Sequence, residues 1–415
     1  MRHIYERQAK RERIFDNMPN LNEFANTIPV APIKLAVLNS ATELGNKINK
    51  YLVKARSNIS SIYKDDPAFQ GYAEESYLMN FSTPRFNSGE GKAVLNESVR
   101  GKDLFILVDV CNHSLTYKMN GFINHMSPDD HYQELKRVIA ATNGKAHRIN
   151  VIMPFLYEGR QHRRNGRESL DCAYAFEELV DMGVSNFITF DAHDPRIQNA
   201  APLSGFDNFS PNYQFARTLL RAEKDLVLDK EHIIVISPDE GALERAIYFS
   251  TVLGADTGMF YKRRDYSTIV NGKNPIVAHE FLGNDIKGKD IIIIDDMISS
   301  GESMLDTSKQ LKAMKAKRVF ICATFGLFTN GLGAFDKAYA DGVFDRVITT
   351  NLCYRPPELL KKKYYLEADM SKFLASIINF MNHDLSTENV MTPTKRIQKI
   401  LAQYSEGASD FDDEK

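Results

Sequence analysis

The chain has 415 residues, 43% of them hydrophobic and 26% charged, which is the composition of a globular protein. Lys and Arg total 52 against 54 for Asp and Glu, so the overall charge gives no drive toward nucleic acid. No apolar run reaches the ~20 residues that cross a bilayer, so we expect no membrane partner.

The N-terminal segment, MRHIYERQAKRERIF, is charged throughout and has no apolar stretch of the kind found in a secretory signal. Its acidic residues argue against a transit peptide, and we expect a surface helix or a partner-binding arm. The cysteines stand far apart in the chain, which favours neither a zinc site nor a disulfide framework. A cytoplasmic location is therefore expected.

Short apolar runs alternate with amphipathic stretches in chain order. In the first half the runs 34–40, 104–110, 150–156 and 186–193 are predicted strands, with helices between them. In the second half the predicted strands lie at 232–240, 259–264, 291–296, 318–325 and 345–351. Nearly continuous apolar strands separated by helices indicate an α/β fold whose sheets are mostly parallel and flanked by helices.

The length favours two domains with short additions, and we expect the two domains to be joined within the Pro- and Gly-containing stretch 195–211. We expect an N-terminal extension at 1–32, one α/β domain at 33–203, a second at 204–375, and a C-terminal helix with an acidic tail at 376–415. Residues 62–80 lack clear periodicity and are expected to form an insertion.

The segment DIIIIDDMISSGES at 290–303 carries the strongest chemical signal. Asp295 and Asp296 follow a predicted strand, and ligands of open α/β sheets bind beyond the carboxyl ends of strands. Paired acids accept hydrogen bonds from vicinal hydroxyls, and a Ser-Ser-Gly loop that opens a helix offers N–H groups to a phosphate. The alternative is that the two acids only cap the next helix.

This segment resembles the phosphoribosyl-binding motif that phosphoribosyltransferases and ribose-phosphate pyrophosphokinases share. The resemblance implies that Asp295 and Asp296 hold the ribose hydroxyls. It also implies a cradle for the 5-phosphate made of Ser299, Ser300, Gly301, Glu302 and Ser303. Here Ser299 stands where the pyrophosphokinases usually have an acid, and Glu302 where they usually have glycine.

The loop YEGRQHRRNGRES at 157–169 holds four arginines after a predicted strand. Four arginines so close together repel one another unless a bound anion neutralises their charge, and this favours an anion-binding loop. The alternative is a solvated basic run on the surface. The loop resembles the RQDR…RE segment with which ribose-phosphate pyrophosphokinases bind ATP. Nucleobase phosphoribosyltransferases have no such loop. The resemblance implies ATP contacts from Arg160, Gln161 and His162, with His162 where Asp is common.

The segment FNSGEGKAVLNESVRG at 86–101 resembles the F-S-D-G-E and E-S-V-R-G stretches of the same family. The resemblance implies that Phe86 stacks on the adenine of ATP and that Glu90 accepts a hydrogen bond from its amino group. In the family these residues reach the site of a neighbouring subunit, which implies a homo-oligomer. Ser88 departs from the family pattern, and a glycine-containing hairpin with a packed Phe86 is the alternative.

Two further segments resemble the metal-associated positions of the family. TFDAHDPRIQN, which resembles the family's D-L-H-A-x-Q-I-Q segment, places His193 after a predicted strand, and ISPDEGALERA places Asp239 after another. The resemblance implies that these two residues hold Mg²⁺ on the ATP phosphates, and oxygen-rich coordination suits that ion. A lone histidine is more often structural than catalytic.

The stretch FYKRRDYSTIVNGKNP at 260–275 resembles the start of the family's catalytic flap. Lys262 and Arg264 fall on the two basic positions that approach the transferring phosphates, and the polar residues after them suit a mobile lid. The alternative is an exposed basic strand end.

Taken together, the resemblance implies two phosphoribosyltransferase-type domains, ATP and ribose 5-phosphate as substrates, and a diphosphoryl transfer that makes 5-phosphoribosyl 1-pyrophosphate and AMP for nucleotide biosynthesis. Two other functions stay open. Ser88, Ser299 and Glu302 suggest a catalytically silent homologue that regulates an active enzyme. The second open function is a phosphoribosyltransferase with an unusual second domain. The loop that contains Arg160 disfavours this alternative.

Overall fold

The computed structural model describes Phe24 and residues 27–60, 66–164, 166–264 and 276–408. The chain divides into two compact units. Unit 1 contains the described residues up to Phe209 together with Met370–Thr392, and unit 2 contains Ser210–Asp369 together with the described residues from Pro393. No helix among the described residues is long and apolar enough to cross a membrane.

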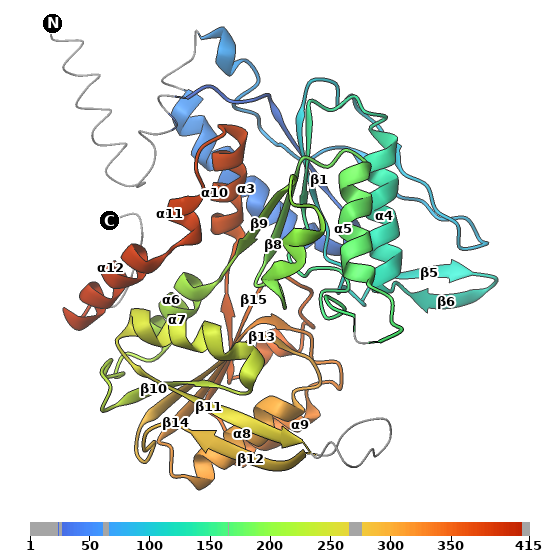
Figure 1. Cartoon of the computed structure of the whole chain (residues 1–415). Coiled ribbons are helices and arrows are strands. Elements are labelled where there is room, and N and C mark those ends of the chain that lie inside the picture. Colours follow the sequence, from blue (N-terminus) through green and yellow to red (C-terminus); the bar gives the residue numbers. More distant parts are fainter. Residues whose placement is uncertain (1–23, 25–26, 61–65, 165, 265–275, 409–415) are drawn as a thin grey trace, which may run out of the picture. The chain divides into compact units, whose positions relative to one another are not determined.

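Unit 1 is built on a five-stranded sheet in which every neighbouring pair of strands is parallel (Figure 1). In spatial order the strands are β1 (Ile33–Val37), β4 (Asp103–Leu107), β7 (Arg148–Ile152), β8 (Asn186–Phe190) and β9 (Gly205–Phe209). Two small antiparallel pairs are added, β2 (Phe81–Ser82) with β3 (Val94–Leu95), and β5 (Thr116–Met119) with β6 (Phe122–His125).

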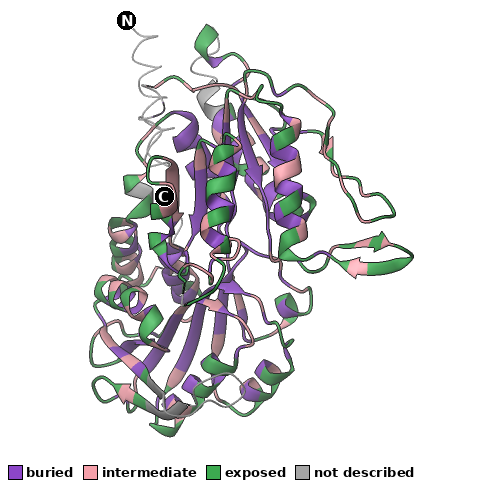
Figure 2. Ribbon diagram, turned by 45° about the vertical axis from the view of Figure 1, so that its right-hand side comes forward, coloured by how far each residue is buried: buried purple, intermediate pink, exposed green. Residues whose placement is uncertain are grey.

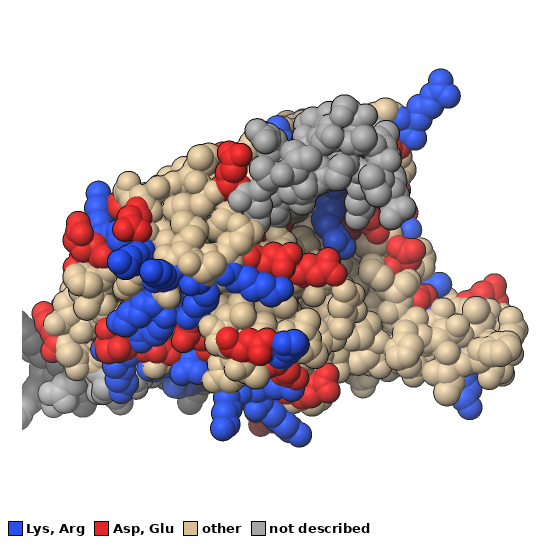
Figure 3. All heavy atoms as spheres, turned by 90° about the horizontal axis from the view of Figure 1, so that it is seen from below, with Lys and Arg blue, Asp and Glu red and all other residues tan. Residues whose placement is uncertain are grey.

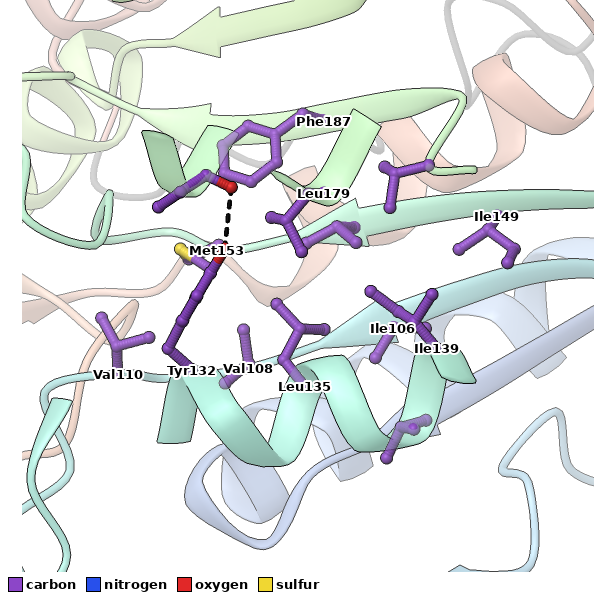
Figure 4. Packing of buried hydrophobic residues seen from close by; sticks show 14 of the residues in the cluster. Ile106, Val108, Val110, Tyr132, Leu135, Ile139, Ile149, Met153, Leu179 and Phe187 are labelled. Atoms are coloured by element: carbon purple, nitrogen blue, oxygen red, sulfur yellow. Dashed lines mark hydrogen bonds between the residues drawn. The ribbon is translucent and has the colours of Figure 1, made fainter. Parts of the chain in front are cut away.

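Helices α4 (Pro128–Ala141) and α5 (Asp171–Asp181) cover one face of this sheet. Because side chains alternate between faces along a strand, Ile106 and Val108 point to this side and meet Leu135 and Ile139 of α4 (Figure 4). The hydroxyl of Tyr132 donates to the carbonyl of Ala175, 2.8 Å away, and so joins the two helices.

Helices α3 (Thr42–Ser60) and α10 (Ser371–Asn382) pack against each other in unit 1. The ring of Phe373 on α10 lies 6.1 Å from that of Phe190 and 5.9 Å from that of Phe209, centroid to centroid, at the ends of β8 and β9. Arg56 of α3 is fully buried and donates to the side-chain oxygens of Asn379 and Asn382. Helix α10 is therefore fixed to unit 1 by apolar and polar contacts.

Unit 2 holds a seven-stranded sheet, parallel except at one edge. Its order is β12 (Ile276–Leu282), β11 (Asp256–Arg264), β10 (Ile233–Ser237), β13 (Asp290–Ile298), β14 (Arg318–Gly326), β15 (Arg346–Thr350) and β16 (Tyr365–Ala368). Its helices are α6 (Asn212–Ala222), α7 (Leu243–Leu253), α8 (Glu302–Ala313), α9 (Gly333–Ala340) and α12 (Thr394–Ser405). Figure 2 shows buried central strands and helices that are exposed on their outer sides.

The predicted α/β class with mostly parallel, helix-flanked sheets is confirmed. Three elements differ from the predictions. The stretch 195–211, predicted as the junction between domains, contains β9, the fifth strand of unit 1. The hairpin β5–β6 was not predicted. Helix α10 begins within the segment expected to close the second domain, yet it belongs to unit 1.

Candidate active site

Three carboxylates gather at the carboxyl ends of two neighbouring strands of unit 2. Asp295 and Asp296 lie on β13, which continues beyond its apolar run to Ile298. Asp239 follows β10, the parallel neighbour of β13, and its Oδ1 accepts from the N–H of Gly241, 3.1 Å away. Parallel strands end at one edge of a sheet, and this is what brings Asp239 near the other two acids.

The electrostatics of this edge are unfavourable to three separate negative charges. Removal of its carboxyl from water, and then repulsion from Asp296 and Asp239, raise the pKa of Asp295 well above its ordinary value. Arg245 acts in the opposite direction, and its Nη2 lies 3.9 Å from Oδ2 of Asp296. The negative charge of the three carboxylates at this edge of the sheet is therefore only partly neutralised. A bound cation or the hydroxyl donors of a sugar would be stabilised there.

The loop from Ser299 to Ser303 leads from β13 into α8. Gly301 is the residue before the helix and has φ +87°, and a Cβ at this position would collide with the ring of Phe335. Gly301 at the N-cap position has no side chain, and the N–H of Glu302, the first residue of α8, donates to the hydroxyl of Ser300, 3.4 Å away. Glu302 is exposed, while Ser299 and Ser300 are partly buried beside the first turn of the helix. The loop thus presents small side chains and the N-terminus of a helix of 12 residues.

The arginine loop of unit 1 follows β7. Arg160, Arg163, Arg164 and Arg167 are all exposed. The side-chain amide of Gln161 donates to the carbonyl of Ser169, 2.9 Å away, and so closes the loop upon itself. The arginines are presented outward on a loop that has its own internal support.

Two strand-end loops of unit 1 meet at a pair of histidines. His162, from the loop after β7, has its ring centroid 5.4 Å from that of His193, which follows β8. Nε2 of His162 lies 3.4 Å from Oδ2 of Asp194. The guanidinium of Arg196 also binds Asp194. Hydrogen bonds from this arginine lower the pKa of Asp194 to about 2, and the electrostatic effect of His162 acts in the same direction. The predicted ATP-contacting loop and the predicted metal-associated histidine are therefore neighbours.

Phe86 and Glu90 lie on a tight turn. The N–H of Phe86 donates to the carbonyl of Glu90, 2.8 Å away, and the N–H of Gly89 donates to the carbonyl of Phe86, 2.9 Å away. The side chain of Phe86 is 53% exposed, so the alternative of a hairpin with a packed phenylalanine does not describe it. The hydroxyl of Ser88 donates to Oε2 of Glu90, 2.9 Å away. An exposed aromatic ring beside a carboxylate can stack on a base and accept from its amino group.

Lys262 and Arg264 lie at the end of β11, where the edge strand β12 pairs with them in antiparallel register. Lys262 is opposite His279 and Arg264 opposite Ile276. The side chains of both basic residues, and the predicted flap at 265–275, lie outside what the structure describes. The role predicted for them stays a prediction.

The predicted magnesium residues lie in different units, His193 in unit 1 and Asp239 in unit 2, and their joint site stays a prediction. Within the described residues, no three His, Cys, Asp or Glu side chains form a metal cage. On the face seen in Figure 3, Lys and Arg side chains lie among Asp and Glu side chains over part of the surface. The formal net charge of the chain is −2.

Two residues of the site region were not predicted. Arg245 lies in the first turn of α7, and only the adjacency of β10 and β13 brings it to Asp296. Asp194 follows His193 directly, where the family segment has alanine, and this departure was the available signal.

The comparisons with known proteins agree with this architecture. Residues 33–183 match the N-terminal domain of ribose phosphate pyrophosphokinase, and residues 207–357 match the phosphoribosyl transferase domain. The fold is similar to that of a crystal structure of phosphoribosylpyrophosphate synthetase from Mycobacterium smegmatis, with a TM-score of 0.67 at 22% identity over 85% of this chain and 99% of that one. The units are thus of the phosphoribosyltransferase class.

Similar proteins of known name identify the family within this class. A ribose-phosphate pyrophosphokinase from Corynebacterium glutamicum is 30% identical over 267 residues, 64% of this chain and 74% of that protein. Another from Pasteurella multocida is 28% identical over 312 residues, 74% of this chain and 90% of that protein. The chain belongs to the ribose-phosphate pyrophosphokinase family of enzymes.

Proposed function

We propose that this chain transfers the diphosphoryl group of ATP to the C1 hydroxyl of ribose 5-phosphate and releases AMP. The observation that carries the proposal is the meeting of the arginine loop with His193 through His162 in unit 1. The sugar-phosphate loop of unit 2 would suit a phosphoribosyltransferase as well as a pyrophosphokinase. The basic loop that contacts the segment of His193 supports an ATP site in addition to it.

ATP is proposed to bind on unit 1. Phe86 stacks on the adenine and Glu90 accepts from its amino group, while the turn between them is held by backbone hydrogen bonds. Arg160, Gln161 and His162 contact the phosphates. Phe86 and Glu90 would serve the ATP site of a neighbouring subunit, so the active form is a homo-oligomer.

Ribose 5-phosphate is proposed to bind on unit 2. Asp295 and Asp296 accept hydrogen bonds from the 2- and 3-hydroxyls, and the cradle of residues 299–303 holds the 5-phosphate at the start of α8. The raised pKa of Asp295 supports a partner that neutralises or solvates this carboxylate edge.

In the reaction, the C1 oxygen attacks the β-phosphorus, and its hydroxyl proton is released to solvent. The bond between the β-phosphorus and the oxygen bridging it to the α-phosphorus breaks, and AMP leaves. Phosphoryl transfer depends chiefly on positioning and on neutralising charge, and Lys262, Arg264 and Arg160 would supply positive charge. Mg²⁺ held by His193 and Asp239 would neutralise phosphate oxygens when bound, and the carboxylate at Asp239 fits the oxygen preference of that ion.

The test is to incubate the purified chain with ATP, Mg²⁺ and ribose 5-phosphate and to measure AMP and 5-phosphoribosyl 1-pyrophosphate together. Equal release of both supports the proposal. If no AMP appears across a range of magnesium and phosphate concentrations, the chain is not an active pyrophosphokinase. A silent regulatory homologue would then be tested by adding the chain to an active relative.

A further inference from the structure

The β5–β6 hairpin lies against the turn that carries Phe86 and Glu90. At the tip of the hairpin the N–H of Asn120 donates to the carbonyl of Asn87, 2.9 Å away. Along its length the ring of Tyr117 lies under the guanidinium of Arg85, with 4.1 Å between Cζ and the ring centroid. Figure 1 shows the hairpin projecting from unit 1 beyond the end of α4.

The fit between turn and hairpin is close at Gly89. This residue has φ +93°, and a Cβ built on it would lie 2.7 Å from Sδ of Met119. Real Cβ atoms do not approach a neighbour so closely, so Met119 occupies the space that any other residue at position 89 would need. The turn is therefore shaped by the hairpin as well as by its own hydrogen bonds.

Turn and hairpin share one anchor at the start of α4. Arg85 is largely buried, and its Nη1 donates to Oδ1 of Asp130, 3.0 Å away, and to the carbonyl of Gly89, 3.3 Å away. Asp130 also closes the capping box of α4 with Ser127. The hairpin ends beside that cap, where the N–H of Met126 donates to the carbonyl of Leu115, 2.9 Å away. Arg85 thus links the helix, the turn and the aromatic ring of the hairpin.

We propose that the β5–β6 hairpin positions the Phe86–Glu90 turn for the base of ATP, with Tyr117 as the positioning residue that acts through Arg85. This inference rests on the proposed function, in which Phe86 and Glu90 contact the adenine. The ring of Phe86 is more exposed than buried, so its direction is set by the backbone of the turn rather than by a core. A turn held in its binding geometry before ATP arrives loses less entropy on binding.

The test compares Tyr117→Ala with Tyr117→Phe in the full-length chain. Phenylalanine keeps the ring under Arg85, and alanine removes it. Tyr117→Ala should raise the KM for ATP and the Kd for ATP roughly fivefold to tenfold, in line with the loss of a cation–π contact. The KM for ribose 5-phosphate should stay unchanged, and so should all constants of Tyr117→Phe. Discrimination between ATP and GTP should fall in the alanine variant alone.

A second variant replaces residues 116–125 with Asn-Gly, since Leu115 and Met126 are already joined by a hydrogen bond. It should show the same selective loss of ATP affinity. Unchanged ATP constants in both variants, or equal losses for both substrates, would overturn the inference. If the wild-type chain binds ATP but releases no AMP, the proposed reaction fails and the Kd comparison still decides the role of the hairpin. If the wild-type chain binds no ATP, both fail.

Discussion

Nε2 of His162 lies 3.4 Å from Oδ2 of Asp194, and this contact joins the arginine loop after β7 to the residue that follows His193. Both residues depart from the family segments they resemble, which have aspartate and alanine at these positions. The two departures are complementary, because a carboxylate at both positions would place like charges together. The His162–Asp194 pair therefore joins the two loops through a contact that aspartate and alanine at these positions would not make.

The contact between His162 and Asp194 can be tested by introducing the family residues at the two positions. His162→Asp should place two carboxylates side by side and reduce kcat/KM for ATP by roughly tenfold or more. The double variant His162→Asp/Asp194→Ala restores the family arrangement and should recover most of that loss. Steady-state kinetics of the wild type, both single variants and the double variant give the coupling energy. Additive losses in the double variant would show that the two residues act separately.

Asp295→Asn should stabilise unit 2 while it impairs binding of ribose 5-phosphate. The pKa of Asp295 is raised in the folded chain, so the folded state holds its proton more tightly than the unfolded state does. The free energy of unfolding of the wild type therefore falls as pH rises from the ordinary carboxyl value toward the raised pKa. Asparagine removes this penalty.

Thermal melts of the wild type and Asp295→Asn between acidic and neutral pH, without Mg²⁺, measure the effect. The melting temperature of the variant should exceed that of the wild type by several degrees at neutral pH, and the gap should close at acidic pH. Asp306→Asn, an exposed aspartate on α8, is the control and should show no such gap. A wild type more stable than Asp295→Asn at neutral pH contradicts the prediction.

Gly301→Ala should destabilise the phosphate cradle. The new Cβ meets both a left-handed backbone and the ring of Phe335, and we expect a loss of roughly 2–4 kcal/mol in the free energy of unfolding. Gly288→Ala is the matched control, because Gly288 has φ +76° with nothing near its Cβ and isolates the backbone cost of about 1 kcal/mol. Denaturant unfolding measures both. If both variants lost the same free energy of unfolding, the ring of Phe335 would have moved aside without cost.

Lys262→Ala should lower turnover on the order of 100-fold, because it removes a positive charge that stabilises the transferring phosphates. Its unfolding transition should match that of the wild type, because Lys262 lies near the end of β11, in the stretch that pairs with the edge strand β12. The control is Lys287→Ala, an exposed lysine of the same unit, which should keep full turnover. Near-normal turnover of Lys262→Ala would remove the flap from the proposed site.

Asn382→Ala should cost about 2–4 kcal/mol, because it leaves buried polar groups without their partner. The side chain of Asn382 accepts from Arg56 and donates to Oδ2 of Asp103, 2.8 Å away, and both of these charged residues are fully buried. Asn46→Ala, on the exposed side of α3, is the control. Hydrogen exchange of β4 and α3 would locate the loss in unit 1, and no increase in exchange there would contradict the role given to Asn382.

Strands buried on both faces were predictable, because an unbroken run such as Ile291–Ile294 leaves little alternative to a central parallel strand. The edge strand β9 was missed because its sequence, GFDNF, begins with glycine and carries Asp207 and Asn208, which are poor strand formers. Candidate site residues could also be predicted where they lie together in one short stretch of sequence. Asp295, Asp296 and Gly301 form one segment whose chemistry can be read locally.

Contacts between segments were not predictable from one sequence. Arg245 is one arginine in an amphipathic helix, and nothing local relates it to Asp296, 51 positions later by residue number. Tyr117 likewise meets Arg85 through a hairpin whose strands carry exposed side chains and so lack an apolar pattern. Such pairings depend on strand order and turn geometry, which are properties of the assembled sheet.

The return of α10 to unit 1 has a consequence for synthesis on the ribosome. All five strands of the unit 1 sheet have been synthesised once Phe209 is made, but Phe373 and Asn382 are made about 160 to 170 residues later. At a translation rate of roughly 5–20 residues per second, the nascent sheet waits for many seconds with part of one face uncovered and Arg56 without its asparagine partners. A stalled or truncated chain that ends before α10 would therefore have an incomplete unit 1. Chaperones could bind the surface that α10 would otherwise cover.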